Sequence, residues 1–213
     1  MTEAEPRLYL LLPPEFVPAE LAPGLAEVLV MNEVASVLLW LSTEDDRFWT
    51  QAAEILLPVC HASGVPLLLG GDANRAARLG ADGVHLEAEA AALSAARKAH
   101  APGLIIGAGG IASRHQAMLA AESGADYVLF GAADPARDRP VAATAILNLT
   151  EWWSELFQVP CVAQADSLDE AQALIQAGAD FIAAGGLVWA DAAGPAAAVR
   201  ALADALHSPV AAS

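Results

Sequence analysis

The chain alternates between two kinds of segment from one end to the other. Short runs rich in Val, Leu and Ile are each followed by a longer, Ala-rich amphipathic stretch, and this unit recurs eight times in 213 residues. The apolar runs lie at 7–12, 36–41, 65–69, 83–86, 104–107, 127–131, 160–163 and 181–184. Such runs suit strands that are buried on both faces of a parallel sheet covered by helices. The pattern predicts an α/β fold, the (β/α)8 or TIM barrel.

The stretches between the apolar runs predict the helices. Clear candidates lie at 46–62, 114–123, 143–157, 168–177 and 195–206. Ser113 and Ser167 stand at N-cap positions, and Asp169 and Glu170 favour the positive end of the helix that follows. A doubly wound open sheet is the alternative fold, but the chain has no early Gly-rich dinucleotide fingerprint. We therefore expect one barrel domain over residues 1–213.

A short Gly-Ala-Asp motif recurs between predicted helices and strands. It stands at 80–82, 124–126 and 178–180. Glycine fits the left-handed conformation that ends a helix, and aspartate can bond backbone groups at a turn. The motif thus indicates αβ turns, which lie on the stability face of a barrel rather than on its active face.

Charge and hydropathy exclude several classes of function. The chain carries 10 basic and 26 acidic residues, a net charge of -16 that would repel a nucleic-acid backbone. No apolar run reaches the roughly 20 residues that cross a bilayer, and the acidic start lacks the order of a signal peptide. We expect a soluble, cytoplasmic protein with neither nucleic acid nor membrane as partner. Cys60 and Cys161 form no metal-spaced pair, so we expect two small buried side chains, with a disulfide as the alternative.

Two residues bear on the possible chemistry. Lys98 is the only lysine and falls in a predicted helix, so no lysine is available at a strand end for Schiff-base chemistry. His85 falls on the fourth predicted strand. It indicates proton chemistry or a ligand contact if it faces the mouth, and a buried, hydrogen-bonded histidine otherwise.

Three segments resemble a known family. They read GADGVHL at 80–86, GLIIG at 103–107 and ADYVLFG at 125–131. Together they resemble the thiamine phosphate synthase and TenI family, over residues 8–206 and most specifically between 65 and 131. The resemblance implies a barrel that binds thiazole phosphate. Synthases join that ligand to a pyrimidine by displacing diphosphate with magnesium, and TenI-type members are thiazole tautomerases.

The resemblance places the family's magnesium ligands on side chains that cannot bind metal. The Asn-Asp pair after the third strand falls on Gly70 and Gly71, and a second Asp falls on Ala90. Magnesium prefers oxygen ligands, which these residues lack in their side chains. Carboxylates that could replace them are Asp72, Glu87 and Glu89. On this basis magnesium is a possible cofactor, and His85 and Glu87 are the candidate catalytic residues.

The diphosphate partners implied by the resemblance are also replaced. The family's Gln-x-Arg-x-Lys is absent from 41–46, where three acids would repel diphosphate. The Ser-Thr pair after the fifth strand becomes Gly109-Gly110. A TenI-type catalytic histidine would fall near Ile111, and His115, one turn further on, is a weak substitute or a surface residue.

Phosphate binding is the property most easily retained, since backbone N–H groups can provide it. Gly185 and Gly186 end the eighth strand, where such barrels usually hold phosphate. Arg137 and Arg139 could add a bidentate clamp, or could pair with nearby acids on the surface. The seventh-strand loop carries Asp166, which is unfavourable beside a phosphate.

Two functional hypotheses follow. The first is a thiamine phosphate synthase/TenI-like protein that acts on or binds a thiazole-phosphate-like ligand, so that its partner is a small phosphorylated molecule. The second is a non-catalytic, ligand-binding or regulatory paralogue that has lost the magnesium-diphosphate site. Trp152 and Trp153 lie on an outer helix, where one of them could mark a homo-oligomer contact.

Overall fold

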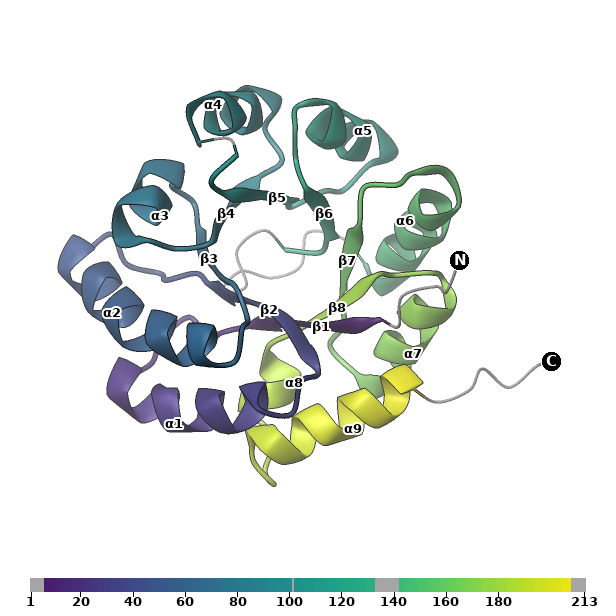
Figure 1. Cartoon of the computed structure of the whole chain (residues 1–213). Helices are drawn as coiled ribbons and strands as arrows, with labels where there is room; N and C mark the ends of the chain where they lie inside the picture. The colour runs from purple at the N-terminus through teal and green to yellow at the C-terminus, as the bar shows by residue number, and fades with distance from the viewer. Residues whose placement is uncertain (1–5, 101, 133–141, 208–213) are drawn as a thin grey trace.

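The eight strands close into a barrel whose helices lie outside it (Figure 1). The computed structural model describes residues 6–100, 102–132 and 142–207. Neighbouring strands pair in parallel and in sequence order, and β8 closes onto β1. The strands are β1 (Arg7–Leu11), β2 (Val34–Leu39), β3 (Leu67–Gly70), β4 (Gly83–Glu87), β5 (Ile105–Gly109), β6 (Tyr127–Phe130), β7 (Cys161–Gln164) and β8 (Phe181–Ala184). The predicted TIM barrel is confirmed.

Helices separate successive strands around the barrel. They are α1 (Pro18–Leu29), α2 (Asp46–Ala62), α3 (Ala73–Leu79), α4 (Ala90–His100), α5 (Arg114–Glu122), α6 (Ala143–Leu156), α7 (Leu168–Gln176), α8 (Gly186–Trp189) and α9 (Pro195–His207). The five predicted helices agree with these bounds to within one residue. Ser113 and Ser167 cap α5 and α7 as expected, because each side chain accepts a backbone N–H of the first turn. The second strand was predicted two residues too late, since Trp40 and Leu41 follow β2 rather than end it.

The three Gly-Ala-Asp motifs tie neighbouring strands together at the N-terminal end of the barrel. Gly80, Gly124 and Gly178 have positive φ after α3, α5 and α7. The aspartate carboxylates accept backbone N–H groups of the preceding strand, each at 2.8 Å: Leu67 to Asp82, Ile106 to Asp126 and Cys161 to Asp180. The sequence predicted such bonds at the turn itself. The structure shows instead that each motif joins two strands.

Apolar side chains fill both the barrel interior and the layer between barrel and helices. The interior cluster consists of Tyr9, Leu11, Leu38, Leu68, Tyr127, Leu129, Val162 and Ala183. Cys60 and Cys161 are buried and free, as predicted. Burial raises the pKa of both thiols to about 12. Within the described ranges, no helix combines the length and apolarity that crossing a membrane requires.

The two adjacent tryptophans of α6 differ in burial. Trp153 is fully buried and stacks on Phe157, whereas Trp152 is partly buried beneath the guanidinium of Arg114. Packing onto the barrel therefore accounts for Trp153. The expected self-association through Trp152 stays a prediction.

Candidate active site at the mouth of the barrel

The C-terminal ends of the strands form one mouth, as parallel strands require. Gly70, Glu87, Gly109 and Gln164 end β3, β4, β5 and β7. Gly131 and Gly185 directly follow β6 and β8. The positions predicted to follow the third, fifth and eighth strands, at Gly70, Gly109 and Gly185, therefore lie at the same end of the barrel.

His85 lies below the mouth, in the middle of β4, and is fully buried. Its Nδ1 is 2.7 Å from the hydroxyl of Tyr127, which is 2.6 Å from the hydroxyl of Tyr9. Its Nε2 is buried and has no hydrogen-bond partner among the described residues. Desolvation lowers the pKa of His85 to about 3, so the imidazole is neutral near pH 7. The geometry matches the second interpretation of this residue, a buried and hydrogen-bonded histidine, although only Nδ1 has a hydrogen-bond partner among the described residues. The catalytic role of His85 stays a prediction.

Two glycines make room for the aromatic rings around His85. Gly70 and Gly107 lie opposite His85 on the two neighbouring strands. A Cβ added at Gly70 would lie 2.3 Å from the ring of Trp40, and one at Gly107 would lie 2.0 Å from the ring of Tyr127. Trp40 meets His85 edge-on, and Tyr127 stacks on it. The indole of Trp40 thus occupies the volume that a side chain at position 70 would need. Position 70 is the one that the resemblance aligns with the family's Asn.

Sequence reasoning did not identify Tyr9, Trp40 or Tyr127 as parts of this cluster. A usable signal was present, because side chains of a strand alternate between its two faces. Tyr127 lies four residues before Gly131 and His85 two before Glu87, so each shares the inward face with a mouth residue. Which rings meet inside the barrel depends on strand stagger, which the sequence does not specify.

The carboxylates considered for magnesium are not assembled into a metal site. Asp72 caps α3, and its Oδ1 accepts the N–H groups of Asn74 and Arg75 at 2.8 and 3.2 Å. Glu87 and Glu89 are exposed. In residues 6–100, 102–132 and 142–207, no three His, Cys, Asp or Glu side chains are grouped to hold a metal ion. The described residues therefore show no assembled magnesium site, and magnesium as a cofactor stays a prediction.

The backbone conformation at Gly71 also disfavours a metal-binding side chain at this position. Its φ is +88°, in the left-handed region that side chains rarely adopt. An aspartate at this position, as in the family, would be strained in the present loop conformation.

The acids after β2 have partners that the sequence did not reveal. Arg75 of α3 donates from Nη2 to Glu44 at 3.1 Å, and its Nε lies 3.5 Å from Asp46. Arg78 donates to Asp46 at 3.3 Å. The expectation that these acids simply repel diphosphate is incomplete, because two arginines from the next unit offset them. No local pattern predicts these pairs, because the two arginines lie 31 and 32 residues further along the chain than the acids they contact.

Of the two glycines after β8, Gly186 leaves the backbone open at the mouth and Gly185 packs closely against β1. A Cβ at Gly185 would approach Leu11 to 3.1 Å, whereas one at Gly186 would have no atom within 4 Å. Gly186 begins α8, so the first N–H groups of that helix have no partner inside it. Arg137 and Arg139 lie outside the described residues. Of the TenI-like positions, Ile111 is buried and His115 is exposed.

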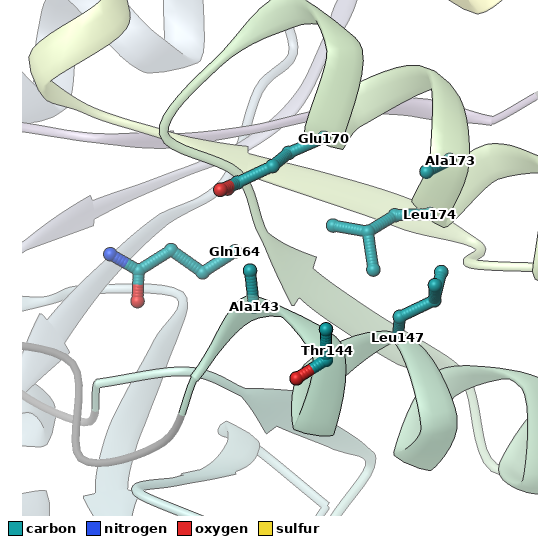
Figure 2. A pocket seen from close by; sticks show the side chains of 7 residues that line it. All are labelled: Ala143, Thr144, Leu147, Gln164, Glu170, Ala173 and Leu174. Atoms are coloured by element: carbon teal, nitrogen blue, oxygen red, sulfur yellow. The ribbon is translucent and has the colours of Figure 1, made fainter.

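An apolar pocket of about 130 Å³ lies beside the mouth, between α6 and α7 (Figure 2). Its lining consists of Ala143, Thr144, Leu147, Gln164, Glu170, Ala173 and Leu174. Figure 2 shows the polar ends of Gln164 and Glu170 directed away from the leucine side of the pocket. Both are engaged: Gln164 accepts the N–H of Ala132 at 2.8 Å, and Glu170 accepts that of Asp166 at 2.9 Å. The pocket is therefore better suited to an apolar group than to a phosphate.

Comparisons with known proteins agree on one family. A family model described as thiamine monophosphate synthase matches residues 8–187. The thiamine-phosphate synthase of Rhodospirillum centenum is 43% identical over 194 residues, which cover 91% of this chain and 94% of that protein. The thiamine-phosphate synthase of Hyphomonas neptunium is 39% identical over 201 residues, covering 92% and 91%.

Solved structures repeat the fold. The thiamine phosphate pyrophosphorylase from Pyrococcus furiosus superposes with a TM-score of 0.78 at 22% identity, covering 95% of this chain and 96% of that one. A 3-hexulose-6-phosphate synthase superposes with a TM-score of 0.67 at 22% identity, covering 93% and 99%. At these identities the likeness concerns the barrel alone.

Proposed function

The chain belongs to the thiamine monophosphate synthase family, a family of thiamine biosynthesis, and we propose from this premise that its barrel mouth acts on or binds a thiazole-phosphate-like ligand. The observation that carries the proposal is the open backbone at Gly186, where an added Cβ would meet no atom within 4 Å. It stands at the C-terminal end of β8, where barrels of this type commonly hold phosphate.

Phosphate recognition in this proposal uses backbone donors. The N–H groups at the start of α8 point out of the helix, and glycine lets an anion approach them closely. Arg137 and Arg139 follow β6 in the sequence and would supply charge-assisted bonds to the same phosphate. Local donors of this kind are needed because the chain as a whole carries a charge of -16.

The remaining candidate residues lie across the mouth from Gly186. Glu87 stands exposed at the rim on β4, and His85 lies two residues below it on the same face. In the proposal, Glu87 donates or accepts a proton at the rim, and His85 contacts the ligand from inside the barrel. Asp72 and Glu89 hold no defined place in it, because the first caps a helix and the second is exposed.

A second candidate function is favoured by three specific observations. Trp40 fills the place of a side chain at position 70, Gly71 has a left-handed φ, and the carboxylate of Asp72 already binds two backbone N–H groups. The first two concern the positions of the family's Asn-Asp pair, and Asp72 follows them directly. All three favour a non-catalytic, ligand-binding or regulatory paralogue that has lost the magnesium-diphosphate site.

The phosphate contact is tested by Gly186→Ala. The added methyl group meets no protein atom within 4 Å, so it should leave the fold intact but block the closest approach of an anion. We expect calorimetric titration to show roughly tenfold weaker binding of thiazole phosphate, about 1.4 kcal/mol. Binding of the unphosphorylated thiazole alcohol should not change.

Gly24→Ala is the matched control, because its Cβ would make only an ordinary 3.7 Å contact with Pro195, on the outer layer of helices. It should bind thiazole phosphate like the parent protein. Equal affinity of the parent and Gly186→Ala for thiazole phosphate would remove this site from the proposal.

A further inference from the structure

Three polar side chains form a chain of hydrogen bonds inside the otherwise apolar barrel. Tyr9, Tyr127 and His85 are 2%, 7% and 0% exposed. The hydroxyls of the two tyrosines lie 2.6 Å apart, and Tyr127 lies 2.7 Å from Nδ1 of His85. The chain ends at Nε2 of His85, a buried atom without a partner in the described part of the protein.

The protons of this chain can be arranged in two directions. In the first, Tyr9 donates to Tyr127 and Tyr127 donates to Nδ1, so the proton of the neutral imidazole is on Nε2. In the second, Nδ1–H donates to Tyr127 and Tyr127 donates to Tyr9. The hydroxyl hydrogen of Tyr9 then has no acceptor among the described residues, and Nε2 is an unpaired acceptor as well.

Both directions leave one buried donor and one buried acceptor unpaired among the described residues: Nε2–H and the Tyr9 oxygen in the first, and the Tyr9 hydroxyl hydrogen and Nε2 in the second. They differ in the bond to His85, because either a phenol O–H donates to an imidazole nitrogen or an imidazole N–H donates to a phenol oxygen. A phenol is the more acidic donor and the imidazole nitrogen is the more basic acceptor, so the first bond is the stronger. The 2.7 Å contact between the Tyr127 hydroxyl and Nδ1 therefore favours the Nε2–H tautomer of His85.

We propose that Tyr127 and Tyr9 hold His85 in the Nε2–H tautomer, and that this N–H is the donor with which the barrel interior binds a hydrogen-bond acceptor of the ligand. The second half rests on the proposed function. It also restricts the ligand atom: a ring nitrogen or an oxygen with a free lone pair fits, and an ammonium group does not. Tyr127 and Tyr9 act through His85 and are positioning residues.

Access to Nε2 leads past Trp40. Of the three rings that surround the imidazole, those of Tyr9 and Tyr127 are buried, and only Trp40 is partly exposed. Trp40 also lies beyond the last residue of β2, so its backbone is outside the strand ladder. Because Trp40 is the least enclosed of these rings, we infer that a ligand atom reaches Nε2 by displacing the edge of this indole.

The tautomer can be read in the ligand-free protein. Nitrogen NMR of the full chain with 15N-labelled histidine distinguishes protonated from unprotonated ring nitrogens, and His85→Gln identifies the His85 signals. We expect a protonated Nε2 and a hydrogen-bonded, unprotonated Nδ1. Tyr127→Phe should move the Nδ1 signal to that of a nitrogen without a donor. Tyr9→Phe, the matched control, keeps the Tyr127 bond and should leave both signals in place. A protonated Nδ1 in the parent protein would overturn the inference.

The ligand contact is tested with thiazole phosphate as the probe. Addition of the probe should shift the Nε2 signal, and Tyr127→Phe should weaken its binding about tenfold while binding of inorganic phosphate stays unchanged. Tyr9→Phe should weaken it less. A probe that binds the parent without moving Nε2 would overturn the ligand contact of His85 and leave the proposed phosphate site at Gly186 standing. A probe that fails to bind the parent at all would overturn both, whereas the tautomer is decided without it.

Discussion

Gly70→Ala tests whether Trp40 really occupies the space of side chain 70. The new Cβ would lie 2.3 Å from two ring atoms of Trp40, so the indole must move by about 1.1 Å to restore the ordinary contact of 3.4 Å. Overpacking of this kind destabilises proteins by about 1 to 3 kcal/mol. In a chain of this length that corresponds to a fall in melting temperature of about 2 to 12 °C.

A double-mutant cycle assigns the effect to the indole. In a Trp40→Leu background the smaller side chain removes the clash, and Gly70→Ala should be neutral or stabilising by about 0.4 to 1 kcal/mol, because alanine restricts the unfolded chain. Urea unfolding of the four proteins gives the coupling energy. A Gly70→Ala variant as stable as the parent, or one equally destabilised in both backgrounds, would refute the packing argument.

Three further predictions follow from burial and backbone geometry. Between pH 6.5 and about 3 the unfolded chain binds a proton at His85 that the folded protein does not. The free energy of unfolding should therefore decrease as the pH is lowered, by up to about 1.4 kcal/mol per pH unit, and less steeply in His85→Gln. Equal slopes for the two proteins in urea titrations would contradict this. Cys60 and Cys161, with thiol pKa values of about 12, should react with a disulfide reagent only on unfolding, so rapid modification of the native protein would be the contrary result. Gly71→Asp with Ala90→Asp should raise magnesium affinity in calorimetric titrations but lower the free energy of unfolding by about 1 to 2 kcal/mol, because φ at residue 71 is +88°; an unchanged magnesium affinity would speak against this placement of the two carboxylates.

The fold could be predicted from the sequence because its signals are local. Buried parallel strands give continuous apolar runs, and Ser113 and Ser167 mark helix starts by a bond to their own first turn. The same holds for Gly80, which ends α3 in the left-handed conformation. Strand ends were less certain, since Trp40 continues an apolar run after the ladder of β2 has stopped.

The site could be predicted only in part, because its contacts join distant segments. Placement at the mouth followed from strand direction alone. The bond between His85 and Tyr127 spans 42 residues, and that between Tyr9 and Tyr127 spans 118. Arg75 likewise reaches Glu44 across 31 residues. Such pairs depend on how far neighbouring strands are staggered, and that stagger leaves no pattern in any single segment.

Formation of thiamine phosphate by the unmodified protein is the most informative measurement. We propose that the mouth keeps a site for thiazole phosphate, while Trp40, Gly71 and Ala90 stand where the family's polar and metal-binding side chains are expected. The assay supplies hydroxymethylpyrimidine diphosphate, thiazole phosphate and magnesium, and a parallel calorimetric titration measures binding of thiazole phosphate. We predict measurable binding of thiazole phosphate with turnover far below about 1 per second, the low end of ordinary enzymes. Turnover at or above that rate would show that Asp72, Glu87 or Glu89 provides a working metal ligand and would contradict this prediction.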